Sequence, residues 1–544
     1  MNKQDKTGPT SVHKGGGPNR PAEPTPIAPW RQSLLQARSG AELLKQMINV
    51  HDAPVLIPQL SVDDLMICIR KIGLADADAV LALASGQQVQ GLLDSDCWNR
   101  DQFEIERVDP WLGTLMAAGP DVLGRHLLAQ DDSLLNLLVQ ASIHVIVVEE
   151  PEDFEPPDDE HVLTPDGRLC ICFPASATRD LPIKIFLDWM MRTDPLLITN
   201  LLIHLPAALK TNLEEDAYRW RSGRMADRGY IDYYDALRIY VPASKAEVAK
   251  AEQVVASEGP ITQHWLEVFK GTQSRLQAAL AAVPSEHLEA VQSSLAVAMN
   301  MALSADRVEL WDEEHQADVV ERIQAGLSLA LESLNGVSST TGQDAATLVA
   351  TPVSVLFRIG YGVTLEAVSR LRRTSVVRRL SGPAGRVDGV DIAELREWAE
   401  WLTARHPSMP NGAPPSSLAD IKEMRNYSEI LADMAKVSGE SRPNHVGIGQ
   451  YLLTQFASGL LGVDTNGPLP ENQLLNAHAL LLDAGEISGS ARDAATVWWL
   501  EQGGTDRSAV STLLNWAESE LGPVPSHRLD ARFQTIFWTA AEQH

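Results

Sequence analysis

Residues Leu213 to Tyr240 read LEEDAYRWRSGRMADRGYIDYYDALRIY, and the fold of the whole chain is best approached from this stretch. Its apolar side chains recur at the spacing of a helix face, first at Leu213, Ala217 and Trp220 and then at Tyr233, Ala236, Leu237 and Tyr240. Gly229 tolerates the backbone conformation that ends a helix, and Asp232 is a typical N-cap for the next helix. The stretch therefore predicts two helices joined at Gly229, the second of which ends before Pro242.

The first of these helices carries many polar side chains. Opposite charges stand four or three residues apart, as in Glu215 with Arg219 and Arg224 with Asp227, which favours ion pairs within the helix. The alternative is a small-ligand site in this polar helix, Arg219 to Asp227, belonging to an enzyme or sensor of unfamiliar type. The candidate residues for either role are Tyr218, Arg219, Trp220, Arg221, Arg224 and Asp227.

The composition favours helices packed on helices. Of 544 residues, 44% are hydrophobic but only 6% are aromatic, and the apolar content lies mostly in short periodic blocks of Leu, Ala, Val and Ile. We therefore predict a mainly all-α protein. The formal net charge of −27 repels nucleic acid and anionic membrane at long range, which makes nucleic acid an unfavourable partner.

The sequence predicts a cytoplasmic protein without a membrane span. Its most apolar stretch, residues 196–209, is interrupted by Asn200, His204 and Pro206 and is shorter than the roughly 20 residues that a span needs. No secretory signal precedes the cysteines. We expect all four to be reduced thiols: Cys68, Cys97, Cys170 and Cys172.

The periodicity changes along the chain and predicts four regions. Residues 1–29 are rich in Gly and Pro and predict a disordered tail. Residues 30–245 hold short capped helices, which predict a superhelical array with a small β element near 143–173. The turn sequence Thr164-Pro165-Asp166-Gly167 indicates a hairpin in that element. Longer helices follow in a middle helical domain, 246–385, and a C-terminal helical domain, 386–544.

Local signals predict where several helices begin and end. Ser61 with Asp64 predicts a capped start, and Gly73 the end of the same helix. Asp109 followed by Pro110 predicts another start. Two capping boxes or close variants are expected later in the chain, Asp391 with Glu394 and Ser417 with Asp420.

Two clusters contain residue types that are used in metal sites or acid–base chemistry. Cys170 and Cys172 point to one side of a predicted strand, within reach of His144 or His161, but a tetrahedral metal site needs more ligands at suitable spacing. The acidic residues Glu309, Asp312, Glu313 and Glu314 stand near His315 and Trp311 and more simply cap the next helix. Because no nucleophile or phosphate-binding loop accompanies them, we predict no catalytic, cofactor-binding or metal-ligating residues and favour a non-enzymatic protein.

The one dense basic run predicts either anion binding or internal ion pairs. It comprises Arg370, Arg372, Arg373, Arg378 and Arg379. Guanidinium groups suit phosphate and carboxylate, so this run, Arg370 to Arg379, is a candidate anion or nucleic-acid surface. In a chain with a net charge of −27, pairing with the molecule's own acids is the simpler expectation.

Several segments resemble an uncharacterised bacterial family of similar length, known only as a domain of unknown function. They are residues 70–74, 81–94, 213–221, 229–236, 356–360 and 417–420. The short-helix half is also remotely similar to the cytosolic N-terminal domain of magnesium transporters and to the helical repeats of the flagellar rotor switch protein. That likeness implies a right-handed superhelix used for packing or partner contact, and it implies no catalytic residues. We therefore expect a non-catalytic cytosolic scaffold or adaptor that contacts an unidentified protein.

Overall fold

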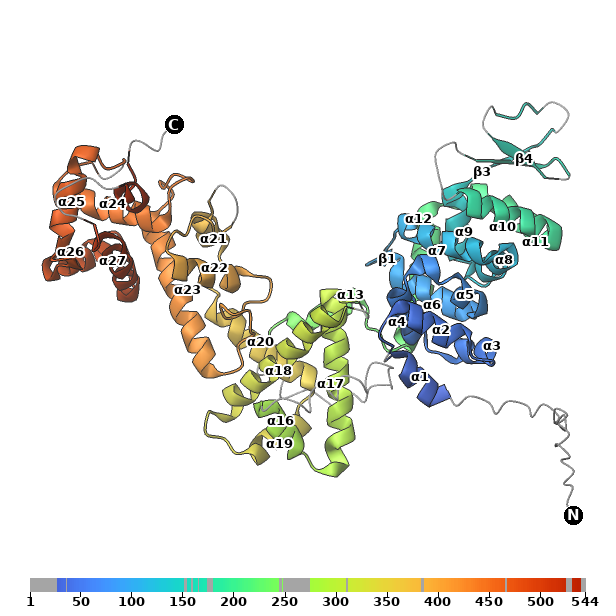
Figure 1. Cartoon of the computed structure of the whole chain (residues 1–544), viewed down its shortest axis with the longest axis horizontal. Helices are drawn as coiled ribbons and strands as arrows, with labels where there is room; N and C mark the ends of the chain where they lie inside the picture. The colour runs from blue at the N-terminus through green and yellow to red at the C-terminus, as the bar shows by residue number, and fades with distance from the viewer. Residues whose placement is uncertain are drawn as a thin grey trace, which may run out of the picture. The chain divides into compact units, whose positions relative to one another are not determined.

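The chain folds into two compact units, Met1–Asp227 and Arg228–His544, and most of it is helical (Figure 1). The computed structural model describes residues 27–35, 37–150, 154–157, 160–164, 166–173, 180–243, 247, 274–309, 312–382, 386–464, 467–524 and 531–539. Helices make up 69% of the structure and the sheets have only two or three strands, which confirms the predicted mainly all-α fold. Of the predicted tail, only residues 27–29 lie among the described residues, where they begin the first helix.

The first unit is a succession of short helices. Its elements are α1 (Ile27–Leu35), α2 (Gly40–Ile48), α3 (Ala53–Leu56), η1 (Ile57–Gln59), α4 (Val62–Ile72), η2 (Leu74–Asp76), α5 (Asp78–Leu83), α6 (Gly86–Asp96), β1 (Trp98–Asn99), β2 (Gln102–Phe103), α7 (Ile105–Ala118), α8 (Pro120–Leu128), α9 (Asp132–Ser142), β3 (His144–Val147), β4 (His161–Leu163), β5 (Leu169–Cys172), α10 (Asp180–Thr193), α11 (Pro195–His204), η3 (Leu205–Ala207) and α12 (Lys210–Asp227). Near neighbours pack on one another, α2 on α4, α5 on α7, α7 on α8 and α8 on α10. Helices this short depend on such packing for their stability.

Two of the predicted helix boundaries in this unit have different outcomes. The Ser61 side chain accepts a hydrogen bond from the backbone N–H of Asp64 at 3.1 Å, and α4 ends at Gly73 with φ +99°, as predicted. The predicted start at Asp109-Pro110 is wrong, because α7 begins at Ile105 and contains Pro110. Pro110 is the sixth residue of α7, where its missing backbone N–H costs the helix one hydrogen bond, that to the carbonyl of Glu106.

The predicted β element is a three-stranded antiparallel sheet. The strand order is β3-β5-β4, so β5, the last of these three strands along the chain, lies in the middle of the sheet. Thr164 to Gly167 connects β4 to β5, and Gly167 takes φ +68°, a conformation that glycine adopts without strain. The Thr164 hydroxyl donates to the Asp166 carboxylate at 2.6 Å, which braces the turn.

The second unit contains longer helices. Its elements are α13 (Tyr233–Ala236), η4 (Leu237–Tyr240), α16 (Arg275–Ala281), α17 (Ser285–Asp306), α18 (Glu313–Asn335), α19 (Thr341–Ala350), α20 (Val353–Ala367), α21 (Thr374–Leu380), α22 (Ala393–Thr403), α23 (Leu418–Ser438), α24 (Ile448–Leu461), η5 (Glu471–Gln473), α25 (Leu474–Leu481), β6 (Leu482–Asp483), β7 (Glu486–Ile487), α26 (Gly489–Glu501), α27 (Arg507–Leu521) and α28 (Arg532–Ile536). In the described part of the chain no single helix is long and apolar enough to cross a membrane. Only α19 and α20 together pass that test, with a bend of 115° between them.

One hydrophobic core of this unit lies among α17, α18 and α20, and a glycine contact brings two of these helices together. A Cβ atom on Gly360 of α20 would lie 2.0 Å from the carbonyl oxygen of Gly326 on α18. No side chain fits in that space, so the two backbones touch. The close crossing places Phe357 and Tyr361 of α20 beside α18.

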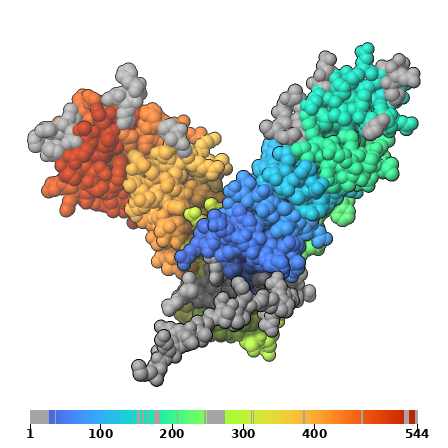
Figure 2. Space-filling view, turned by 45° about the vertical axis from the view of Figure 1, so that its right-hand side comes forward, coloured from blue at the N-terminus to red at the C-terminus, as the bar shows by residue number. Residues whose placement is uncertain are grey.

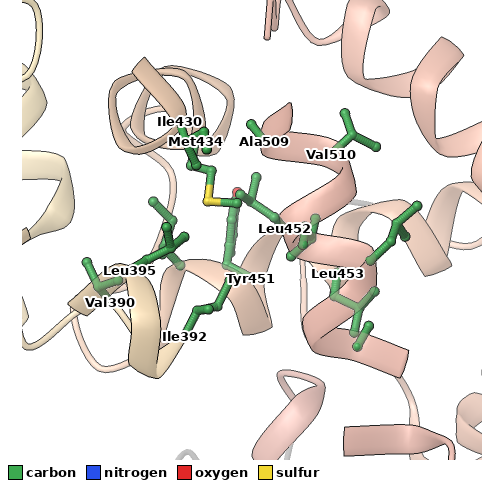
Figure 3. Packing of buried hydrophobic residues seen from close by; sticks show 14 of the residues in the cluster. Val390, Ile392, Leu395, Ile430, Met434, Tyr451, Leu452, Leu453, Ala509 and Val510 are labelled. Atoms are coloured by element: carbon green, nitrogen blue, oxygen red, sulfur yellow. The ribbon is translucent and has the colours of Figure 1, made fainter. Parts of the chain in front are cut away.

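The other core is built around α23, which packs against α21, α22, α24 and α27. Figure 3 shows Leu395, Met434 and Leu452 converging there from α22, α23 and α24. In space-filling view the orange and red residues form one continuous packed body (Figure 2). Trp499 is completely buried in this core.

Capping in this unit departs from the prediction at one site. Ser417 and Asp420 form the predicted capping box of α23. Asp391 does not cap its own helix, α22; its carboxylate accepts from the backbone N–H groups of Gly449 and Gln450, both at 2.7 Å, and so caps α24. Sequence spacing cannot reveal a cap supplied from 58 residues away.

The structure places its main division after Asp227. The two helices of the opening stretch, α12 and α13, therefore belong to different units. The domain borders near 245 and 385 stay predictions. Within the second unit the first core extends to Tyr361, and the second is formed mainly by residues from Ala367 onward together with Leu329 of α18.

Candidate functional site

The polar helix lies in α12, and Arg224 is bound inside the first unit. Its guanidinium donates to the Asp94 carboxylate from Nε at 2.6 Å and from Nη2 at 2.9 Å, and Nη2 also lies 3.0 Å from Asp131. Asp94 is completely buried, so its negative charge is stabilised by the guanidinium of Arg224 and would be unfavourable without it. The helical spacing predicted that Arg224 would pair with Asp227; its partners are instead acids from α6 and the N-cap of α9.

Two more side chains of the polar helix pack against Trp98. The Arg221 guanidinium lies 5.4 Å from a Trp98 ring centroid, and its Nε donates to the backbone carbonyl of Asp94 at 2.8 Å. The Tyr218 ring centroid is 5.9 Å from that of Trp98. These contacts fix α12 on α6 and on the β1–β2 hairpin, so Arg221 and Tyr218 have a structural role.

The remaining candidates of this helix face outward. Trp220 is 61% exposed, and Arg219 lies at the limit of ion-pair distance, 4.0 Å, from Asp216. Asp227 is exposed as well. The structure thus divides the six candidate residues between an inner face, which is occupied by internal contacts, and an outer face.

An exposed apolar surface lies on the neighbouring helix α11. Only Ile198 and Leu202 of this helix are buried. Three other aliphatic side chains are exposed, Leu196 by 78%, Leu197 by 41% and Ile203 by 48%. We call these three residues the α11 surface. From the sequence, this stretch was noted only for its hydrophobicity. Whether an apolar side chain is buried or exposed depends on how the helices pack.

Most arginines of the basic run bind within the second unit. Arg370 donates to Asp433 at 3.2 Å, and both Arg378 and Arg379 lie within 4 Å of Glu440. Arg372 donates to the backbone carbonyls of Thr403, Ala404 and Arg405 at the end of α22. Arg373 is exposed.

A cavity of about 720 Å³ opens in the second unit, between α18, α20 and the segment that follows α22. Its walls include the rings of Phe357, Tyr361 and Trp401. Prolines 407, 414 and 415 add further apolar surface. Such a volume is within the range of small-molecule sites.

A hydrogen-bonded network supports one wall of this cavity. At its centre, the Asp306 carboxylate accepts from the Tyr240 hydroxyl at 2.6 Å, from Arg322 Nη1 and from His406 Nε2 at 3.1 Å. The Tyr361 hydroxyl lies 3.2 Å from the other imidazole nitrogen, Nδ1. The network joins the end of α17 to η4, α18, α20 and the segment after α22.

The protonation states of this network follow from burial and charge. Burial raises the pKa of Asp306, but the hydrogen bond from His406 and the charge of Arg322 together outweigh it, and the pKa falls to about 2. Burial is the main cause that lowers the pKa of His406, so the imidazole is neutral near pH 7. The ionised carboxylate can only accept, so Nε2 carries the proton and Nδ1 accepts from Tyr361.

Within the residues that the structure describes, this arrangement leaves neither His406 nor Tyr361 available as a base. Both nitrogens of His406 are engaged, and burial raises the pKa of Tyr361, which keeps its hydroxyl protonated. The network therefore shapes the wall. None of its central residues had been singled out as a site from the sequence, because Asp306, Arg322 and His406 are far apart in the chain; only the arginine, histidine and proline content of residues 405–407 hinted at them.

The other two predicted clusters contain no metal centre among the residues that the structure describes. Cys170 and Cys172 are buried free thiols with their sulfur atoms 3.8 Å apart, and His144 and His161 both pair with Cys172 across the sheet. Asp312 caps α18 by accepting from the backbone N–H of His315 at 3.1 Å. Trp311 lies outside the described residues.

Comparison with known proteins gives a family but no activity. No curated protein and no solved structure matches the chain. The predicted likeness to transporter and rotor domains therefore stays a prediction. The model of a family of unknown function, DUF6178, matches residues 20–438, which include the first unit from residue 20 onward and the second unit as far as the end of α23. The chain belongs to this family of unknown function, as the sequence resemblance indicated.

Proposed function

We propose that this protein is a non-catalytic helical adaptor that binds a protein partner through the α11 surface. The observation on which the proposal mainly rests is the exposure of Leu196, Leu197 and Ile203 on one short helix. Covering an aliphatic side chain fully contributes about 1.5–3 kcal/mol. A partner that covered these three would gain enough to form a specific contact, since a few residues carry most of the energy of an interface.

The position of α11 in the helical array supports the same proposal. Among the residues that the structure describes, the helix packs mainly on α10 and on the turn η3. Terminal elements of stacked helical arrays normally present a polar outer face to water. An apolar face at such a position suits a surface that is covered in the functional state.

A protein suits this surface better than a membrane or a nucleic acid. The net charge of −27 opposes approach to anionic lipid and to nucleic acid. Arg192, which precedes α11 in the chain, is paired with Asp188. A cytoplasmic location is part of the proposal, and the free state of all four cysteines supports it.

The two alternative functions have less support. A ligand site in the polar helix would need Arg221 and Arg224, which already bind Asp94. A nucleic-acid surface on the basic run would need arginines such as Arg370 and Arg372, which bind groups of the same unit.

The proposal is tested by crosslinking and affinity capture from the native cell, with the double variant Leu196→Glu/Leu197→Glu compared with the wild type. Val55→Glu is the matched control, because Val55 is 61% exposed on α3 of the same unit. We expect one partner to be captured by the wild type and by the control but to be lost by more than tenfold from the double variant. Thermal unfolding of all three proteins verifies that each is folded.

Two results would contradict the proposal. The first is a partner captured equally by all three proteins, or no reproducible partner. The second is flotation of the wild type with phosphatidylcholine vesicles that the double variant abolishes, which would make α11 a membrane-surface helix.

A further inference from the structure

The cavity of the second unit has cationic groups with unused hydrogen-bond donors. Within the described residues, all hydrogen bonds of the Arg322 guanidinium start from Nη1. Nε and Nη2, the edge that binds a carboxylate with two parallel hydrogen bonds, are left for a ligand. Arg405, whose side chain is 59% exposed, uses only Nη2, toward the carbonyl of Ala305 and the Asp306 carboxylate. Both arginines line the cavity.

The same cavity also carries acids. Asp318 and Glu321 of α18 line it and are exposed, and neither forms an ion pair within the part of the chain that the structure describes. Asp318 stands four residues before Arg322 on α18, the spacing at which side chains meet, and Glu321 is the residue next to Arg322 in the chain. The lining therefore offers positive and negative charge side by side, which disfavours a polyanion such as a nucleotide.

The rest of the lining suits a flat apolar group. Phe357, Tyr361 and Trp401 present rings, and Pro407 and Pro414 present rigid apolar surface. The hydrogen-bonded network around Asp306 holds Tyr361 and Arg322 in place, so the site is formed before a ligand arrives.

From these three features we propose that the cavity binds a small zwitterion with an aromatic side chain, that is, a free aromatic amino acid. The carboxylate binds to Arg322 and Arg405, the ammonium group binds to Asp318 or Glu321, and the ring lies against Phe357 and Trp401. This site is independent of the α11 surface, which belongs to the other unit.

Isothermal titration of the purified full-length chain with three probes tests the assignment. The probes are L-phenylalanine, 3-phenylpropionate, which lacks the amine, and phenethylamine, which lacks the carboxylate. We expect L-phenylalanine to bind and each truncated probe to bind roughly tenfold to hundredfold more weakly, the change that the loss of a charge-assisted hydrogen bond produces.

Variants assign each charge. Arg405→Gln should weaken the binding of L-phenylalanine and 3-phenylpropionate by roughly tenfold and leave that of phenethylamine unchanged. The double variant Asp318→Asn/Glu321→Gln should weaken the binding of L-phenylalanine and phenethylamine by roughly tenfold and leave that of 3-phenylpropionate unchanged. Arg405 is preferred to Arg322 because Arg322 is half-buried and paired with Asp306. The matched control is Arg378→Gln, an exposed arginine outside the cavity. No heat with L-phenylalanine at millimolar concentration, or equal affinity for all three probes, would overturn the proposal, and so would binding that Arg405→Gln leaves unchanged.

Discussion

Replacing Asp433 should destabilise the second unit more than any surface change, because this carboxylate is completely buried and serves five donors. Its Oδ2 accepts from Trp499 Nε1 at 2.9 Å and from the backbone N–H groups of Thr505 and Asp506, both at 2.8 Å. Its Oδ1 accepts from the Thr505 hydroxyl at 3.0 Å and from Arg370 at 3.2 Å. These bonds outweigh burial and lower the pKa of Asp433.

The expected loss in the free energy of unfolding follows from the hydrogen-bond donors that each substitution leaves without an acceptor. Asp433→Ala leaves the buried Nε1–H of Trp499 and two part-buried backbone N–H groups without an acceptor. Because a fully buried group costs about 1–3 kcal/mol and a part-buried one less, we expect a loss of about 3 kcal/mol or more that stays below ~9 kcal/mol. Asp433→Asn keeps one acceptor oxygen but loses the charge, so a loss of ~2–4 kcal/mol is expected. Arg370→Gln is the control. Its loss should stay under about 1 kcal/mol, because Asp433 keeps its four other donors and the Arg370 side chain is 39% exposed.

Urea denaturation followed by tryptophan fluorescence measures the three differences. The order Ala, then Asn, then the Arg370 control is the result that the structure predicts. A loss below about 0.5 kcal/mol for Asp433→Asn, or an equal loss for Arg370→Gln, would refute the reasoning and would show that the acid is bound less tightly than its geometry indicates.

Three further predictions concern other contacts. Arg224→Gln should destabilise the first unit by ~3–5 kcal/mol, since it leaves the buried Asp94 charge unpaired, and urea denaturation tests this. Gly360→Ala should lower the melting temperature, because the added methyl would lie 2.0 Å from a carbonyl oxygen, at a cost of ~1–3 kcal/mol or more; Gly342→Ala, where the methyl meets nothing within 4 Å, should not. Burial lowers the pKa of His126 below its ordinary 6.5, so near that pH the unfolded chain binds a proton at this residue more readily than the folded chain does. The free energy of unfolding should therefore fall as the pH drops below about 6.5. His126→Gln should remove that part of the pH dependence of the melting temperature, and an unchanged pH profile would contradict this assignment.

Local signals in the sequence predicted local structure well. The cap at Ser61, the turn at Gly167 and the capping box at Ser417 each depend on residues two to four positions apart, and the structure has all three. The overall helical class could be predicted for the same reason, since periodicity records which face of each helix is buried.

Long-range partners could not be predicted. Arg224 and Asp391 were both assigned to neighbours in sequence, and both bind groups from distant segments. The cavity depends on the same kind of contact, because Asp306 meets His406 across 100 residues. Spacing rules describe one helix at a time, whereas these contacts are set by how helices pack.

Hydrogen–deuterium exchange of the full chain, with and without its captured protein partner, tests the central claim most directly. The account predicts that the partner slows exchange in residues 195–209, the segment of α11 and its exposed leucines, while α3 exchanges at the same rate. Unchanged exchange in 195–209, with protection confined to other segments, would contradict the claim that the α11 surface is where this protein binds its partner.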